Sequence, residues 1–401
     1  MRMKSRWGLA MLAIACLAGM NSCAKAGNPG LVTQSFMWVA TTGDQMVRSY
    51  TIQLDSGVVA QVGDAIATGL QPQSMGITPD GRELFIANTG DSTIGVYTVN
   101  SDGTLKLQGT TPSSGQMPVA LAVDPTGQFL FVADQNTSDV SAYQISSTSL
   151  APLGALFLQT PSPAIPATPS ALAVSPVGGF LYVADSLNNT VVGLSYDNTG
   201  VLAPLPATQG PCGNAGYCVQ VGTNPSGMAF SRCAGVTNRT LVCGTADNDS
   251  LFVSNAGSNT VSVFSACIQV STPCPSPNGT LTAVGTPVAA CCGPTTFMVD
   301  PAADFVYVLE AGAAQVGEFS YAPVTGTLSP LSPGAVSTGT GPFSGGITAN
   351  STSVTTTNWV FVSNAGGSSI SGFRVTSAGR LGVLSSGPFP VPAQPVAILL
   401  R

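Results

Sequence analysis

The 401-residue sequence predicts an all-β fold: a seven-bladed β-propeller of four-stranded antiparallel blades, with one blade closed by the N- and C-terminal strands. Three observations support this prediction. A proline-led pattern recurs about every 50 residues, a period typical of propeller blades. One copy of the pattern is divided between the two chain ends. Glycine (46) and proline (30) are abundant and only 7% of residues are charged, as expected for many short strands and turns.

The repeat is clearest in residues 71–88, 117–134 and 168–185, which share the framework Pro-x6-Pro-x-Gly followed by an apolar run. Weaker copies begin at Pro225, Pro294 and Pro342. The seventh copy is split between residues 37–41 and 394–400. A linear solenoid would not need divided ends, and a β-sandwich would not repeat seven times. The pattern therefore favours a closed ring, in which the chain ends share a blade and no sheet edge stays open.

Each repeat is expected to contain four strands. A short apolar strand follows the first proline, a Pro-x-Gly turn reverses the chain, and a run such as 129–133 forms the second strand. An alternating strand such as 94–99 comes third, and a turn such as 100–103 leads to the fourth. The second strand is apolar on both faces, which is typical of a sheet covered on both sides. Neighbouring blades would provide that cover.

Disorder is the competing explanation for the glycine and proline content, but 44% of residues are hydrophobic, which is more than a disordered chain would carry.

The N-terminus has the pattern of an export signal. Arg2, Lys4 and Arg6 precede an apolar stretch at 7–20, which is shorter than the roughly 20 residues that span a bilayer. Cys23 ends the sequence Gly-Met-Asn-Ser-Cys, which resembles the lipobox of bacterial lipoproteins. We therefore expect a signal peptide at 1–22, a lipid on Cys23, a linker at 23–35 and the propeller at 36–401. Ordinary cleavage nearby, releasing a soluble product, is the alternative.

These features predict an exported monomer in the periplasm or at the cell surface, attached to a bacterial membrane only through the lipid. Beyond residue 22 the chain keeps nine basic and 18 acidic residues, a net charge of −9. Such a surface repels phosphate backbones, so nucleic acid is not an expected partner.

Eight cysteines lie in one window of the chain, and an even number in an exported protein predicts disulfides. They are Cys212, Cys218, Cys233, Cys243, Cys267, Cys274, Cys291 and Cys292. The short loops 212–218, 233–243 and 267–274 favour local bridges, although the sequence leaves the connectivity open. A metal site is the alternative, but there is no C-x-x-C pair and no histidine.

The pattern Pro-x-Ala-Leu-Ala-Val-x-Pro-x-Gly-x-x-Leu-Tyr-Val-Ala-Asp at 169–185 resembles the lactonase-type seven-bladed propellers, relatives of 6-phosphogluconolactonase and of the YVTN-repeat proteins. The resemblance covers nearly all of the chain from about residue 36. It implies one of two functions: hydrolysis of a sugar lactone, or binding without chemistry.

The residue types in the sequence favour binding without catalysis. Lactone hydrolysis needs a base and a donor for the developing oxyanion, and the chain has no histidine and few scattered cations. We therefore expect a module that binds a carbohydrate, peptide or protein on its loop-bearing face. The alternative is a sugar-lactone hydrolase that uses carboxylates, with or without a divalent metal.

Candidate site residues end the seven second strands: Thr41, Asn88, Asp134, Asp185, Asn255, Glu310 and Asn364. Five of them are our candidate ligand contacts: Asn88, Asp134, Asp185, Asn255 and Asn364. A ring of such oxygens could bind sugar hydroxyls or Ca²⁺, although no cofactor is required. The alternative is that these side chains cap turns. Capping explains Glu310 least, so Glu310 is the candidate catalytic base.

Overall fold

The computed structural model describes residues 34–158, 166–206, 216–231, 236–237, 240–241, 249–268, 279–302, 304–348 and 357–401. The predicted signal peptide, Cys23 and most of the predicted linker lie outside these residues. So do four of the candidate disulfide cysteines: Cys212, Cys233, Cys243 and Cys274. Within the described part, no helix is long and apolar enough to cross a membrane.

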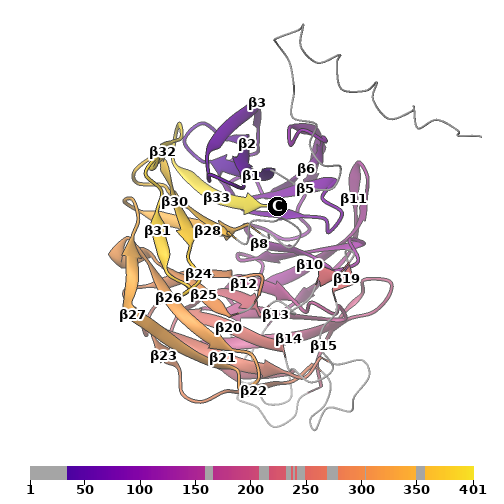
Figure 1. Ribbon diagram of the computed structural model, residues 1–401. Coiled ribbons are helices and arrows are strands. Elements are labelled where there is room, and N and C mark those ends of the chain that lie inside the picture. Colours follow the sequence, from indigo (N-terminus) through magenta and orange to yellow (C-terminus); the bar gives the residue numbers. More distant parts are fainter. Residues whose placement is uncertain are drawn as a thin grey trace, which may run out of the picture. The chain divides into compact units, whose positions relative to one another are not determined.

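The described residues form seven antiparallel blades around a common axis (Figure 1). Blade 1 contains β33 (Pro395–Leu400), β1 (Gln34–Thr41), β2 (Met46–Gln53) and β3 (Val59–Ala67). Blade 2 contains β4 (Pro72–Ile77), β5 (Glu83–Asn88), β6 (Thr93–Val99) and β7 (Leu105–Pro112). Blade 3 contains β8 (Pro118–Val123), β9 (Phe129–Asp134), β10 (Asp139–Ser146) and β11 (Ser149–Phe157). Blade 4 contains β12 (Pro169–Val174), β13 (Phe180–Asp185), β14 (Thr190–Tyr196) and the outer pieces β15 (Leu202–Pro204) and β16 (Cys218–Gln220).

The remaining blades follow the same order from the axis outward. Blade 5 contains β17 (Pro225–Phe230), β20 (Asp249–Asn255), β21 (Thr260–Ala266), β22 (Leu281–Ala283) and β23 (Val288–Ala289). Blade 6 contains β24 (Pro294–Val299), β25 (Phe305–Glu310), β26 (Gln315–Ala322) and β27 (Thr327–Ser337), with the short 3₁₀ helix η2 (Ala311–Ala313) after β25. Blade 7 contains β28 (Pro342–Ile347), β29 (Trp359–Asn364), β30 (Ser369–Val375), β31 (Leu381–Val383) and β32 (Phe389–Pro390). A separate two-stranded sheet pairs β18 (Val236–Thr237) antiparallel with β19 (Thr240–Leu241).

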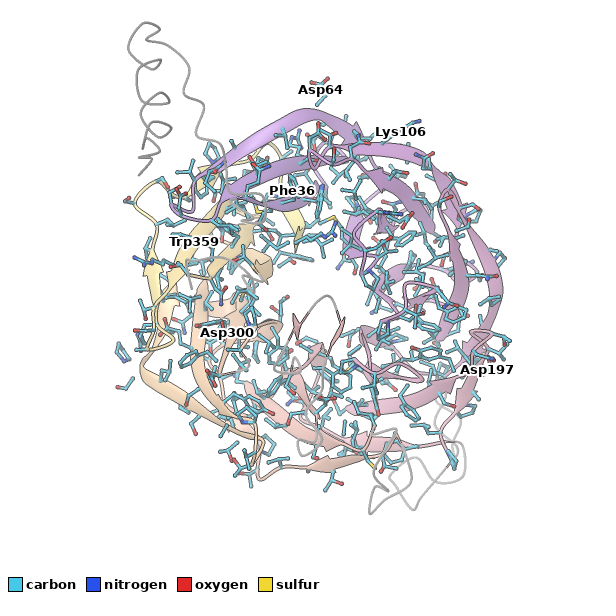
Figure 2. The ribbon with its side chains drawn as sticks, turned by 45° about the vertical axis from the view of Figure 1, so that its right-hand side comes forward. Phe36, Asp64, Lys106, Asp197, Asp300 and Trp359 are labelled. Atoms are coloured by element: carbon cyan, nitrogen blue, oxygen red, sulfur yellow. A yellow bond between two sulfur atoms is a disulfide. The ribbon has the colours of Figure 1, made fainter. Side chains whose placement is uncertain are left out.

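The predicted closure is confirmed. β33 from the C-terminus pairs antiparallel with β1 from the N-terminus, in a register that runs from Met37 opposite Leu400 to Thr41 opposite Pro395. The first strands of all seven blades contact their neighbours in one unbroken circuit: β4, β8, β12, β17, β24, β28, β33 and back to β4. Figure 2 looks into this ring. The fold class read from the repeat is therefore correct.

The hydrophobic core is divided among the blade interfaces. Among the described residues, buried apolar side chains form seven clusters, and each cluster joins two neighbouring blades. The second strands supply much of it; every residue of β9 and β29 is buried. This is why those strands are apolar on both faces, as the sequence predicted.

Aromatic side chains also link neighbouring blades through hydrogen bonds. Trp38 of blade 1 donates its indole N–H to the Gly103 carbonyl of blade 2 at 2.9 Å. Tyr182 of blade 4 donates to the Gly279 carbonyl of blade 5 at 2.8 Å. Gly103 has a φ of +84°, and a Cβ there would lie 2.2 Å from the ring of Phe36. The glycine that ends this turn is therefore required both by its backbone and by the neighbouring blade.

Candidate functional site

A cavity of about 560 Å³ lies on the axis of the ring. It is lined mainly by the first three residues after the blade proline, taken from the innermost strand of every blade. These side chains are small, hydroxylated or apolar. No described residue with an ionisable side chain lines the cavity. A neutral chamber of this size is within the range of small-molecule sites.

The hydroxyl groups of the cavity are held in place by the strand of the next blade. Ser170 donates to the Pro225 carbonyl and Ser226 to the Pro294 carbonyl, both at 2.6 Å. Ser74 and Ser344 instead accept backbone N–H groups, from Leu121 and Ile398.

Several polar groups remain available to a ligand. Within the described part of the chain, the hydroxyls of Ser74 and Ser344 donate to no acceptor, and the Thr296 hydroxyl and the Gln73 amide make no side-chain hydrogen bond. Phe343, which also lines the cavity, is 39% exposed. The cavity thus combines free hydrogen-bond donors with a partly exposed aromatic residue.

The ring of strand-end residues occupies seven equivalent positions, as predicted, but its side chains are buried. Thr41, Asn88, Asp134, Asp185, Asn255, Glu310 and Asn364 are each between 0% and 3% exposed, and none of them lines the axial cavity. Their partners belong to the loop that enters the same blade, to the turn that follows or to the adjacent third strand. Asp185 accepts the Thr168 N–H at 2.9 Å, and Asn364 accepts the Gly339 N–H at 3.1 Å. These contacts are those of turn caps, the alternative interpretation, and a ligand role for the five candidates stays a prediction.

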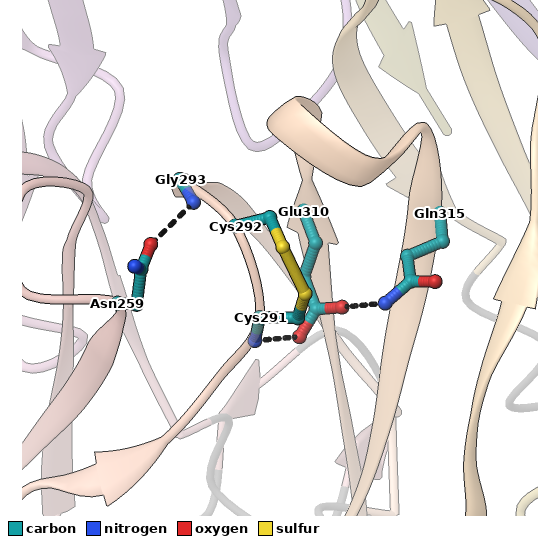
Figure 3. The surroundings of a disulfide bond; sticks show 6 residues. All are labelled: Asn259, Cys291, Cys292, Gly293, Glu310 and Gln315. Carbon is teal, nitrogen blue, oxygen red and sulfur yellow. Dashed lines mark hydrogen bonds between the residues drawn. A yellow bond between two sulfur atoms is a disulfide. The ribbon is translucent and has the colours of Figure 1, made fainter.

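Glu310 is similarly enclosed (Figure 3). One carboxylate oxygen accepts the Cys291 N–H at 2.8 Å, and the other accepts the side-chain amide of Gln315 at 2.5 Å. Burial raises the pKa of Glu310, while the hydrogen bonds from Gln315 and Cys291 oppose the rise. The next residue, Ala311, lines the cavity, yet both oxygens of Glu310 are already used. A catalytic role would require the loop at Cys291 to move away.

Asp134 has the most perturbed carboxyl of the ring. Burial raises its pKa to about 6 against the opposing hydrogen bonds of Ser113 and Ser141, and the charge of Asp139 adds to the rise. The two serine hydroxyls each donate to one carboxylate oxygen at 2.7 Å. A raised pKa is common at functional sites, but here it follows from burial in a capped turn.

The described residues contain no group of three or more histidine, cysteine or acidic side chains that could hold a metal ion. Calcium binding therefore stays a prediction without a site among them.

The cysteines do form disulfides where the structure describes them. Cys291 and Cys292 are joined to each other, and Cys218 and Cys267 are also disulfide-bonded. The bridge between adjacent cysteines was not anticipated. Its only signal in the sequence is a Cys-Cys pair placed apart from the three short loops.

Comparison with known proteins agrees with this geometry. Residues 68–165, which span blades 2 and 3, match the family model described as "Lactonase, 7-bladed beta-propeller". The resemblance to the lactonase-type propellers is confirmed. No curated protein matches the chain significantly.

Solved structures share the fold over most of their length. A candidate 6-phosphogluconolactonase from Bacteroides uniformis is 16% identical, with a TM-score of 0.73 over 92% of this chain and 100% of that one. The periplasmic gluconolactonase PpgL of Pseudomonas aeruginosa is 20% identical, with a TM-score of 0.72 over 92% and 99%. A functionally unknown protein from Desulfotomaculum acetoxidans is 18% identical, with a TM-score of 0.63 over 91% and 98%. At these identities the likeness shows a common fold.

Proposed function

We propose that this protein is an exported, lactonase-like propeller that binds an uncharged carbohydrate in its axial cavity and does not hydrolyse it. The observation that carries the proposal is the neutral lining of the cavity, where no described residue has an ionisable side chain. We further propose that it acts in the periplasm or at the cell surface, held by a lipid on Cys23.

The absence of charge among the lining residues disfavours hydrolysis on chemical grounds. Opening a lactone requires a group that takes a proton from water and donors that stabilise the developing oxyanion. Hydroxyl and amide groups can act as donors, but a serine or threonine hydroxyl is a weak nucleophile without an adjacent base. The nearest candidate base, Glu310, has both oxygens engaged by Cys291 and Gln315.

The same lining suits a sugar. Ser74, Thr296 and Ser344 can donate to hydroxyl or ring oxygens, and the Gln73 amide can both donate and accept. Phe343 is a partly exposed aromatic residue of the lining, against which the apolar face of a pyranose ring can pack. A charged ligand would find no described counter-charge in the cavity and would lose its hydration without compensation.

A lactone hydrolase is the second candidate. It is favoured by the lactonase family match over residues 68–165. In that case Glu310 would be the base, and the loop at Cys291 would have to open to admit substrate.

One pair of measurements separates the two. The purified protein is incubated with a panel of sugar lactones, with added Ca²⁺ or with EDTA, and titrated calorimetrically with neutral mono- and oligosaccharides. The proposal expects no turnover and saturable binding of at least one sugar. Thr296→Val, which keeps the side-chain shape and removes the hydroxyl, should weaken binding about tenfold, the effect of one hydrogen bond of about 1.4 kcal/mol.

Glu310→Gln is the matched control, since this carboxylate does not line the cavity. Binding unchanged in Glu310→Gln supports the proposal. Turnover that Glu310→Gln abolishes would establish the hydrolase instead, and an absence of saturable binding across the panel would refute the carbohydrate assignment.

A further inference from the structure

Cys291 and Cys292 form a disulfide between neighbouring residues in the loop that enters blade 6 (Figure 3). Both cysteines are exposed to solvent. By contrast, Cys218, which is also disulfide-bonded, is 1% exposed. The vicinal bridge is therefore open to thiol reagents in the folded protein.

The fold does not need this bridge. In blade 6 the Gly312 N–H donates to the Cys292 carbonyl at 2.8 Å. Equivalent bonds form in entry loops that contain no cysteine, from Gly90 to the Leu70 carbonyl and from Gly257 to the Thr223 carbonyl, both at 2.9 Å.

A second hydrogen bond in this loop also recurs without cysteines. The Asn259 side chain accepts the Gly293 N–H at 2.7 Å, just as Asn189 accepts the Asn224 N–H at 2.7 Å in the preceding blade. A disulfide between adjacent residues also closes a loop of almost no length, so it removes little conformational entropy from the unfolded state. The bridge is thus surplus to the stability of the loop.

The bridge contacts the segment η2, which reaches the axial cavity. A Cβ on Gly312 would lie 2.7 Å from the Cys292 carbonyl oxygen, so η2 packs directly on Cys292. Ala311, the first residue of η2, lines the cavity. On its other side, the Cys291 N–H is bonded to Glu310. A change in the conformation of the Cys291–Cys292 peptide would therefore reach both the cavity rim and the buried carboxylate.

We propose that Cys291–Cys292 is a reversible thiol–disulfide exchange site. A thiolate of an external dithiol attacks one sulfur atom of these two exposed residues, the Cys291–Cys292 S–S bond breaks, and the second thiol of the reagent displaces the mixed disulfide. Two electrons and two protons pass to the protein, which gains two thiols, and the dithiol becomes a disulfide. Reduction also frees the peptide between the two cysteines to adopt conformations that the small ring excludes.

The reduced form presents two adjacent thiols on an exposed loop. This arrangement suits bidentate capture by a thiophilic trivalent arsenical. Phenylarsine oxide would form two As–S bonds and release one water molecule, with no change in oxidation state. The arsenical is therefore a specific probe for the reduced pair.

The test treats the folded protein with dithiothreitol, confirms by circular dichroism that the fold persists, removes the reductant and adds phenylarsine oxide. Mass spectrometry should find an arsenical on the peptide that contains residues 291 and 292, and reoxidation before labelling should abolish it. Hydrogen exchange should accelerate at 291–293 and 311–313 on reduction, while blades 2 and 3 keep their rates.

The double variant Cys291→Ser/Cys292→Ser is the matched control and should take up no arsenical in this segment. If it does not fold, the untreated oxidised protein serves as the unlabelled reference. The proposal is overturned if the arsenical reaches 291–292 only in denaturant. It is equally overturned if reduction leaves exchange at 311–313 unchanged, because the bridge would then be isolated from the cavity rim. Neither readout depends on the proposed carbohydrate binding.

Discussion

Replacing Asp134 with asparagine should stabilise the propeller in a pH-dependent way. Asp134 ends β9 with no exposed surface, and its two carboxylate oxygens accept the hydroxyls of Ser113 and Ser141. Burial, and to a smaller extent the Asp139 charge opposite it in the β9–β10 register, raises its pKa from 3.8 to about 6. The native state therefore binds this proton more tightly than the unfolded chain does.

The sign and the size of the effect follow from that difference. The contribution of Asp134 to stability is complete below pH 3.8 and is lost as the pH rises to about 6, because ionising the buried carboxyl opposes folding. A rise of about two pH units at 1.36 kcal/mol each corresponds to roughly 3 kcal/mol. Asparagine cannot ionise, so Asp134→Asn should recover about this amount at neutral pH.

The protein itself shows that asparagine fits the position. Asn255 and Asn364 end the second strands of blades 5 and 7, and each donates its side-chain amide to a serine hydroxyl, Ser262 or Ser371, at 3.0 Å. In Asp134→Asn, Ser141 would accept in the same way after its hydroxyl rotates.

Urea unfolding followed by tryptophan fluorescence, at pH 4 and at pH 7.5, measures the difference. Trp38 and Trp359 are buried at blade interfaces and report loss of the ring. Relative to wild type, the stability of Asp134→Asn should rise by about 2.4 kcal/mol from pH 4 to pH 7.5, because the unfolded carboxyl is already about half ionised at pH 4. The reciprocal variant Asn364→Asp should lose stability over the same range. A difference that does not vary with pH would refute the reasoning.

Four further outcomes are expected from unfolding measurements. Arg380→Ala should lower the free energy of unfolding by about 3 kcal/mol, because it leaves the fully buried Glu318 without its ion-pair partner at 2.8 Å. Arg380→Lys keeps the positive charge and should cost less; equal losses in the two variants would mean that this charge does not stabilise the fold. Ile398→Ala should cost about 3 kcal/mol by opening a cavity in the interface between blades 7 and 1, where an effect under 1 kcal/mol would mean that this closure adds little. Tyr182→Phe should cost about 1 kcal/mol through loss of the bond to Gly279, and no change would show that water replaces the hydroxyl. EDTA should not shift the urea midpoint, and a clear fall would point to a structural cation.

The architecture could be predicted from local patterns because each blade repeats them. The prolines from Pro72 to Pro395 mark the first strands, and the doubly apolar runs mark the second. Even the ring closure could be predicted from the two half-repeats at the chain ends. A blade needs four strands, and each chain end supplies only some of the strands of that blade. The equivalence of Thr41, Glu310 and the other strand ends was also correct.

The direction of those strand-end side chains could not be predicted. Asp185 and Asn364 cap the loop that enters their own blade, and that loop covers them, so a ring that is regular in the sequence is closed to solvent in the structure. The vicinal bridge at Cys291 was missed for a related reason: spacing rules favour bridges across loops, and nothing local shows that a Cys-Cys pair stands exposed.

The sequence by itself determined the number of blades, their strand order and the partnership of the two chain ends, because these depend on apolar and turn patterns that each repeat contains in full. Only the tertiary structure decided where a ligand can enter. The axial cavity is built from one short segment of each blade, and its neutral lining appears only when seven segments, far apart in the chain, face one another across the axis. No pattern within a single repeat predicts how these seven segments combine to line the cavity.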